Sequence, residues 1–276
     1  MVTQRRNRRL SLVLPCLLAV ACGAQRHQER GFPDGETDGG GAAPLHLEGV
    51  LRDEHDRPVA DTRVLACMAN QCLYGASGDD GRFAFTIESR ADLVIKTEPD
   101  PLAMPRRGAA MVPVQPGQLS EIDVGNVYVP DLPEGQALAS VNAPQTIRVG
   151  DGLELTLQRS VLVPPLGVAL FDVAARRLKP SAVPVYPVLG EHERVVAVYA
   201  LHPFASRSAI PIAVRAPSDL APNTRVTFRT ISDLDGTFSD PVPGVATGAF
   251  VTTDPGVGIT ELTHLVVAAD GEERKH

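Results

Sequence analysis

Aromatic residues are scarce in this sequence. Tryptophan is absent, and phenylalanine, tyrosine and tryptophan together make up 4% of the 276 residues. A site that stacks sugars on aromatic rings is therefore poorly supplied. Proline and glycine, in contrast, number 24 each, and this punctuation favours short strands and turns over long helices.

The chain also has no excess of positive charge. Its formal charge is −7 at pH 7, with the histidines counted as neutral. Removal of residues 1–21, which carry four arginines, would bring the charge to about −11 (−7 minus 4). A surface that binds nucleic acid needs clustered lysine and arginine. The composition therefore argues against nucleic acid as a partner.

Motifs that carry catalytic or metal chemistry are missing as well. The sequence contains no H-E-x-x-H pair, no G-x-S-x-G elbow after a strand and no G-x-x-x-x-G-K-S/T phosphate loop. The seven histidines lie far apart. We therefore predict a protein without catalytic residues, cofactor or metal site. A hydrolase whose site is assembled only in space is the distant alternative.

The most informative stretch that is present lies at the N-terminus. Arginines at positions 5, 6, 8 and 9 precede a short apolar run, which ends in small residues. This order predicts a secretory signal peptide over residues 1–21. The apolar run is too short to span a bilayer, which needs about 20 apolar residues.

Residues 18–23, LAVACG, resemble the lipobox of bacterial lipoproteins. The resemblance implies that the Cys22 thiol is lipidated and that the chain is cut before it. Gly23 after the cysteine then implies an outer-membrane lipoprotein that faces the periplasm or the cell surface. Ala19 departs from the pattern, in which leucine is usual. The alternative is an ordinary signal peptide, cut so that Cys22 stays unmodified.

The remaining chain predicts an all-β fold with two β-sandwich-like domains after a cleaved signal peptide and a flexible tether. Residues 22–44 are polar and glycine-rich and predict a disordered linker. Residues 45–130 and 141–270 each hold short apolar runs between turn residues, which is typical of sandwiches. Residues 131–140 predict a linker between the two domains, and residues 271–276 a tail.

The first domain resembles the carboxypeptidase regulatory-like domain, a transthyretin-like sandwich. The resemblance rests on LEGV at 47–50 with Asp53, on RPVA at 57–60 with Val64, and on DDGRFAF at 79–85. It implies a modular, non-catalytic role. Its strands are expected at residues 45–51, 62–69, 72–77, 82–87, 91–97, 109–114 and 122–129.

The second domain shows strand patterns with one exception. Residues 167–178 place apolar side chains at a spacing near 3.6, so we predict a short helix there, ended by Lys179 and Pro180. Its strands are expected at residues 145–149, 153–158, 195–201, 210–216, 225–231, 246–253 and 261–269.

Cys67 and Cys72 flank four residues between two strand patterns. Across a hairpin they can reach the geometry of a disulfide, and export brings the chain into an oxidising compartment. Zinc would need two further ligands at suitable spacing, and a redox site would favour C-x-x-C. We therefore predict a disulfide between Cys67 and Cys72.

Two other polar features give less specific predictions. The Asp233 to Gly236 segment, DLDG, hints at calcium, but both key ligand positions of a calcium loop are then filled by apolar residues, so a turn explains it better. His264 alternates within an expected strand and could face solvent.

The sequence as a whole predicts a non-catalytic binding or scaffolding lipoprotein of the cell envelope. Its partners would be the membrane, through the lipid anchor, and an envelope protein or glycan. A glycan- or peptide-binding module is the alternative.

Overall fold

The computed structural model describes residues 43–98, 106–139, 142–168, 170, 172–184, 189 and 193–270. The predicted signal peptide, the lipidation at Cys22, the tether up to residue 42 and the tail at 271–276 lie outside the described residues. None of the helical segments in the described residues has the length and apolar character needed to cross a membrane.

The predicted all-β class is confirmed, because the described elements are strands apart from two short 3-10 helices. The N-terminal half (residues 45–130) contains β1 (Leu45–Arg52), β2 (Arg63–Met68), β3 (Gln71–Ala76), β4 (Arg82–Ile87), β5 (Leu93–Thr97), β6 (Met111–Val114) and β7 (Glu121–Tyr128). The C-terminal half (residues 131–270) contains β8 (Gln136–Ala137), β9 (Gln145–Gly150), β10 (Leu153–Leu157), η1 (Arg159–Val161), β11 (Leu162–Val163), β12 (Asp172–Arg177), η2 (Pro180–Ala182), β13 (Glu193–His202), β14 (Ser206–Pro217), β15 (Arg225–Thr230), β16 (Val242–Ala246), β17 (Phe250–Thr253), β18 (Ile259–Leu262) and β19 (His264–Asp270).

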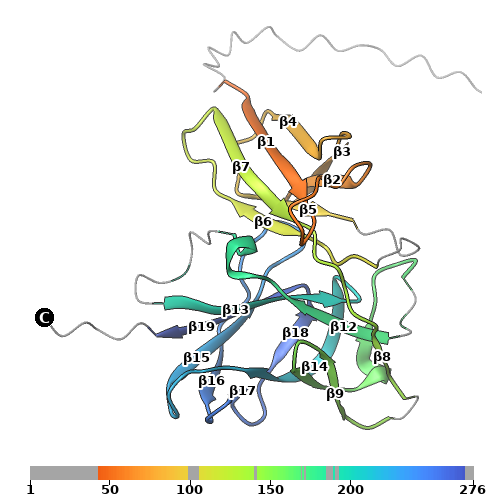
Figure 1. Ribbon diagram of the computed structural model, residues 1–276, viewed down its shortest axis with the longest axis vertical. Helices are drawn as coiled ribbons and strands as arrows, with labels where there is room; N and C mark the ends of the chain where they lie inside the picture. The colour runs from red at the N-terminus through yellow and green to blue at the C-terminus, as the bar shows by residue number, and fades with distance from the viewer. Residues whose placement is uncertain are drawn as a thin grey trace, which may run out of the picture. The chain divides into compact units, whose positions relative to one another are not determined.

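The N-terminal half is a sandwich of two sheets (Figure 1). Its described strands form a three-stranded sheet, β4-β1-β7, and a four-stranded sheet, β3-β2-β5-β6. Alternate residues of β1 and β4 are buried, among them Leu47 and Phe85, because successive side chains of a strand point to opposite faces. They pack against Val64 and Ile95 of the other sheet in one core.

The C-terminal half is a single curled sheet rather than two separate layers. Its twelve described strands join in one hydrogen-bonded network, whose main path is β8-β12-β13-β19-β15-β16-β17-β14-β10-β9. The sheet curls far enough that the end of β9 meets β12: a Cβ added to Gly150 would lie 2.2 Å from the carbonyl oxygen of Ala175. One core cluster, which includes Tyr199 and Phe228, fills the interior.

The predicted helix at 167–178 is wrong over the residues that the structure describes there. Residues 172–177 form β12, which pairs with β13 and β8. The consecutive residues Val173, Ala174 and Ala175 are all buried, so neighbouring segments cover both faces of the strand. Hydrogen bonds to strands on both edges therefore outweigh the helical spacing of the apolar side chains. Small apolar residues also suit a strand that is buried on both faces.

Two predicted strands are each divided in the structure. The expected strand 246–253 is the end of β16 and all of β17, joined by a turn in which Gly248 has φ +78°. The expected strand 261–269 is the end of β18 and most of β19, separated at Thr263. The first break is a hairpin turn, because β16 and β17 pair antiparallel with each other.

A third apolar cluster joins the two halves. From the N-terminal half come Leu65, Cys67, Val94 and Met111, and from the C-terminal half come Leu178, Val198, Ala200, Ile231 and Val266. The stretch expected to be a linker also packs: Leu132 and Leu138 are buried, and β8 pairs with β12. Independent folding of the two halves stays a prediction.

Candidate functional site

The predicted disulfide between Cys67 and Cys72 is present. The two cysteines are paired residues of the β2–β3 hairpin, with their Cα atoms 4.0 Å apart. Cys67 is fully buried in the cluster that joins the two halves, and Cys72 packs against it. The bond therefore fixes a hairpin at that junction.

The Asp233 to Gly236 segment forms a turn that contacts the N-terminal half. The Oδ1 atom of Asp235 accepts hydrogen bonds from the backbone N–H and hydroxyl of Thr237. Asp233 is paired with Lys96 of β5, whose Nζ lies 3.5 Å from Oδ2 and also donates to the Asp233 carbonyl. A Cβ added to Gly236 would lie 2.9 Å from the Cβ of Val94. These residues hold the two halves together.

The expectation that His264 could face solvent is wrong. Its side chain is 1% exposed, and Nε2–H donates to the carbonyl of Ala109, 2.8 Å away. Burial lowers the pKa of His264 to about 4, although the hydrogen bond to Ala109 opposes the shift. His264 is therefore a neutral structural residue at the junction.

His202 lies elsewhere, near the ion pair that Arg106 makes with Asp172. Burial, and then the charge of Arg106, lower its pKa, while Asp172 raises it. The structure thus places His202 and His264 in different environments, and His192 lies outside the described residues.

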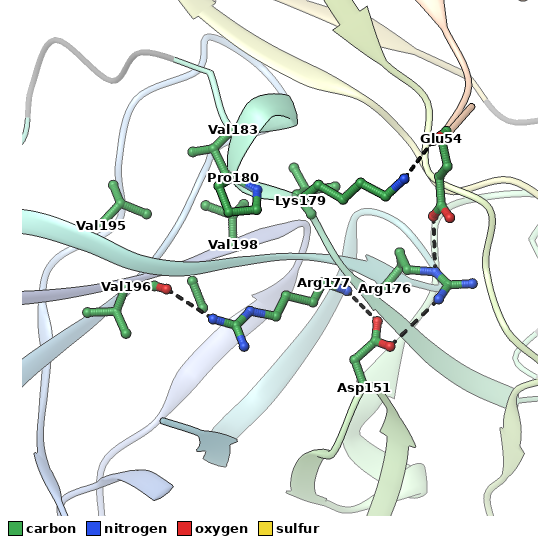
Figure 2. Close-up of a pocket in the computed structure, with 12 residues that line it drawn as sticks. Glu54, Asp151, Arg176, Arg177, Lys179, Pro180, Val183, Val195, Val196 and Val198 are labelled. Atoms are coloured by element: carbon green, nitrogen blue, oxygen red, sulfur yellow. Dashed lines mark hydrogen bonds and ion pairs between the residues drawn. The ribbon is translucent and has the colours of Figure 1, made fainter. Parts of the chain in front are cut away.

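A cleft of about 750 Å³ opens where β12 and β13 separate (Figure 2). Its walls come from the loop after β1, the turn after β9, the end of β12, the segment around η2 and the first half of β13. The twelve residues that line it are Glu54, Asp151, Arg176, Arg177, Leu178, Lys179, Pro180, Val183, Val195, Val196, Ala197 and Val198.

The cleft exists because β12 leaves its neighbour after Arg177. Arg177 is paired with Tyr199, and the N–H of Leu178 makes one further bond to the Val198 carbonyl, at 2.8 Å. Pro180 then follows at the start of η2. Proline has no N–H and cannot continue a ladder. The chain therefore turns away from β13.

This departure leaves part of β13 with a strand neighbour on one side only. Val195 and Ala197 are paired with β19, and Val196 lies at a register shift between them. On the opposite side, the described part of the chain places no strand against these three residues. An unpaired strand edge offers backbone groups to another chain.

The charged groups of the cleft divide into two kinds. Arg176 is neutralised, with Nε 3.2 Å from Glu54 and NH1 3.6 Å from Asp151. Arg177 and Lys179 instead donate to backbone carbonyls, of Val196 at 3.3 Å and of Glu54 at 2.7 Å. Figure 2 shows the valines gathered towards one end of the cleft, where the Arg177 guanidinium reaches Val196, and Glu54, Arg176 and Asp151 towards the other.

Asp53 holds the loop that carries Glu54. Its Oδ1 accepts the N–H groups of His55 and Arg57, at 2.8 and 3.0 Å, and its Oδ2 accepts the Arg57 side chain. Burial alone would raise the pKa of Asp53, but these hydrogen bonds outweigh it and lower the pKa to about 2. Asp53 thus positions the loop that forms one wall of the cleft.

The described residues that line the cleft offer charged and apolar side chains. None of its twelve described residues is serine, threonine, cysteine or histidine. Its two carboxylates are engaged by Arg176. Across all described residues, no group of three or more His, Cys, Asp or Glu side chains could hold a metal ion.

Sequence reasoning missed this site. Arg176 and Arg177 fall in the segment predicted to be a helix, and Val196 in an ordinary strand pattern. The Lys179-Pro180 pair is the one available signal, because it marks the end of an element beside an apolar strand.

No family model and no curated protein matches this sequence. Among solved structures, it is similar to a proposed carbohydrate-binding protein from Bacteroides uniformis ATCC 8492. The two are 7% identical, and the match covers 83% of this chain and 80% of the other with a TM-score of 0.20. A likeness this weak carries no argument about fold or ligand.

Proposed function

We propose that this protein is a non-catalytic binding protein of the cell envelope, which holds a segment of a partner protein in the cleft beside β13. The observation that carries the proposal is the unpaired edge at Val195–Ala197, which opens into a cleft with an apolar floor. Main-chain hydrogen bonds along such an edge give affinity to a partner strand, and pockets beside it give selectivity.

The envelope location is supported by the predicted signal peptide at residues 1–21 and by the disulfide. Disulfides persist in exported proteins and are rare in the cytosol, and the chain forms one between Cys67 and Cys72. The modular role of the N-terminal half follows from its resemblance to the carboxypeptidase regulatory-like domain. In this proposal a lipid at Cys22 anchors the protein to the outer membrane.

The anchor has a direct test. Cys22→Ser removes the thiol that would be acylated and should move the protein from the membrane fraction to the soluble fraction, because several acyl chains hold a protein firmly to a bilayer. Fractionation followed by immunoblotting measures the change. An unchanged membrane fraction would show that Cys22 is not the anchor.

Binding in the cleft can be tested in living cells with a photo-crosslinking amino acid. Lys179, which is exposed in the cleft, is one position, and Tyr74, which is 70% exposed on β3 outside the cleft, is the control. We expect a discrete protein adduct from position 179 and none from position 74. Val196→Trp, which places a larger side chain in the cleft, should abolish that adduct while the protein still melts cooperatively.

Equal adducts from both positions, or an adduct that survives Val196→Trp, would contradict this function. A glycan ligand is less favoured, because the twelve described lining residues include no aromatic ring. Retention on cell-wall polysaccharide that is lost with Val196→Trp would support the glycan instead.

A further inference from the structure

We infer that the segment bound in the cleft is an extended peptide that pairs as a strand with β13 and carries acidic side chains next to its apolar part. The inference rests on the proposed function and specifies its ligand. It is drawn from how the β13 edge is occupied in the free protein, and from how the charges of the described lining residues are paired.

The edge of β13 is covered by a side chain where a strand would otherwise lie. The Arg177 guanidinium donates to the carbonyl of Val196 at 3.3 Å, which is longer than the usual 2.7–3.2 Å of such bonds. An incoming strand can supply a backbone N–H to the same carbonyl. Arg177 thus holds the acceptor until the peptide arrives, and the exchange releases its guanidinium.

The released guanidinium then needs an anion. Among the described residues that line the cleft, the carboxylates are Glu54 and Asp151, and both lie against Arg176. The Lys179 ammonium donates to the Glu54 carbonyl. The described lining therefore carries three cations against two anions, in a chain whose formal charge is −7. A carboxylate of the peptide would supply a charge-assisted hydrogen bond to Arg177.

The valines of the cleft determine which apolar side chains the peptide would carry. Val183 and Val195 are half-buried and line the cleft together with Val198. Apolar side chains of a peptide strand would bury against them, and their removal from water favours binding. The expected ligand is therefore an extended segment that carries β-branched residues and, next to them, aspartate or glutamate.

A simpler role for the same cations is protection of an open edge, since lysine and other charges at strand edges discourage unwanted pairing. In that case no peptide of either charge should bind. The two roles therefore predict different results for the same set of peptides.

The probes are three eight-residue peptides, measured with purified protein by fluorescence anisotropy at low salt. The first alternates threonine and valine and ends in two aspartates. The second replaces both aspartates with lysine, and the third keeps the aspartates but has alternate backbone nitrogens methylated. We expect the first to bind about tenfold more tightly than the others, because it alone offers both carboxylates to Arg177 and backbone N–H groups to the β13 edge.

Charge-swap variants sharpen the test. Arg177→Gln should weaken the aspartate peptide about tenfold, and Arg177→Glu should reverse the preference towards the lysine peptide. Arg225→Gln is the matched control, because Arg225 is an exposed arginine of the same half that pairs with Asp254 at 3.0 Å, outside the cleft. Its affinity for the aspartate peptide should stay within twofold of the wild type. Melting curves confirm that each variant is folded.

Equal binding of the aspartate and lysine peptides, or full binding of the methylated peptide, would overturn the inference. No binding of any peptide would overturn it in favour of edge protection. The proposed function fails separately, if the crosslinker at position 179 gives no adduct that depends on the cleft. An adduct at position 179 together with charge-independent peptide binding would contradict the acidic character of the ligand and leave the proposed function standing.

Discussion

The two halves of the molecule enclose their cores in different ways. The N-terminal half stacks two sheets, so its core lies between layers and four strands remain at sheet edges: β4, β7, β3 and β6. The C-terminal half curls one sheet around its core, which leaves little unpaired edge along the path. In a sheet that curls this far, an interruption in the hydrogen bonds between neighbouring strands exposes a strand edge. The interruption between β12 and β13 is where the cleft lies.

The comparison also shows that the halves are not independent in their packing. The cluster that joins them includes the disulfide of one half and strands of the other. Polar groups reinforce it, with Lys96 paired to Asp233 and His264 bonded to Ala109. We expect the N-terminal sandwich to hold its topology alone while drawing much of its stability from the C-terminal half.

Separation of the halves should have the largest effect. A fragment of residues 45–130 should show β-type circular dichroism and a cooperative melt, because its two sheets share their own core. Its melting temperature should fall by more than about 10 °C, because the exposed cluster side chains would each contribute roughly 1.5–3 kcal/mol when buried. If the fragment melts cooperatively only in the presence of residues 141–270, the boundary near 131–140 is wrong.

The next largest effect should come from the ion pair between the halves. Lys96 and Asp233 have side chains only 9% and 16% exposed. Asp233→Ala leaves the Lys96 charge buried without its carboxylate and should cost about 3 kcal/mol of unfolding free energy. Lys96→Met should cost less, because Asp233 keeps Arg207 at 3.6 Å. Urea denaturation measures both, and equal costs would show that burial of the lysine charge does not dominate.

His264 should make the junction sensitive to acid. Because burial holds the pKa of His264 near 4 in the folded protein, against 6.5 for the free side chain, the unfolded chain binds more protons between these values. The free energy of unfolding should therefore fall as pH drops from 6.5 to 4, by up to about 3 kcal/mol. Urea titrations across this range should show the slope in the wild type and not in His264→Gln. Parallel slopes would mean that other groups cause the acid sensitivity.

The smallest expected effect distinguishes junction contacts from backbone strain. Gly236 and Gly256 have similar φ values of +73° and +81°, so alanine at either position should strain the backbone by a similar amount. A Cβ at Gly236 would meet Val94, whereas one at Gly256 would meet nothing within 4 Å. Gly256→Ala should cost about 1 kcal/mol, and Gly236→Ala about 1 kcal/mol more. Equal costs in thermal melts would show that the junction yields freely.

The sequence by itself determined the features that depend on neighbouring residues. Alternation of buried and exposed positions placed β4 at residues 82–87. The spacing of Cys67 and Cys72 across a short turn predicted their bond, because a hairpin brings near neighbours face to face. In each case the decisive contacts lie within a few residues, so the local pattern carries the information.

The tertiary structure alone decided the features that depend on distant partners. Residues 172–177 became a strand because β8 and β13 offered hydrogen bonds on both edges. His264 became buried because Ala109, 155 residues away, accepts its hydrogen bond. The cleft needed the Asp53 loop, the end of β12 and the β13 edge to meet, and no local pattern records that meeting. Long-range pairing outweighs local preference here because a strand gains its hydrogen bonds and burial only from other segments of the chain.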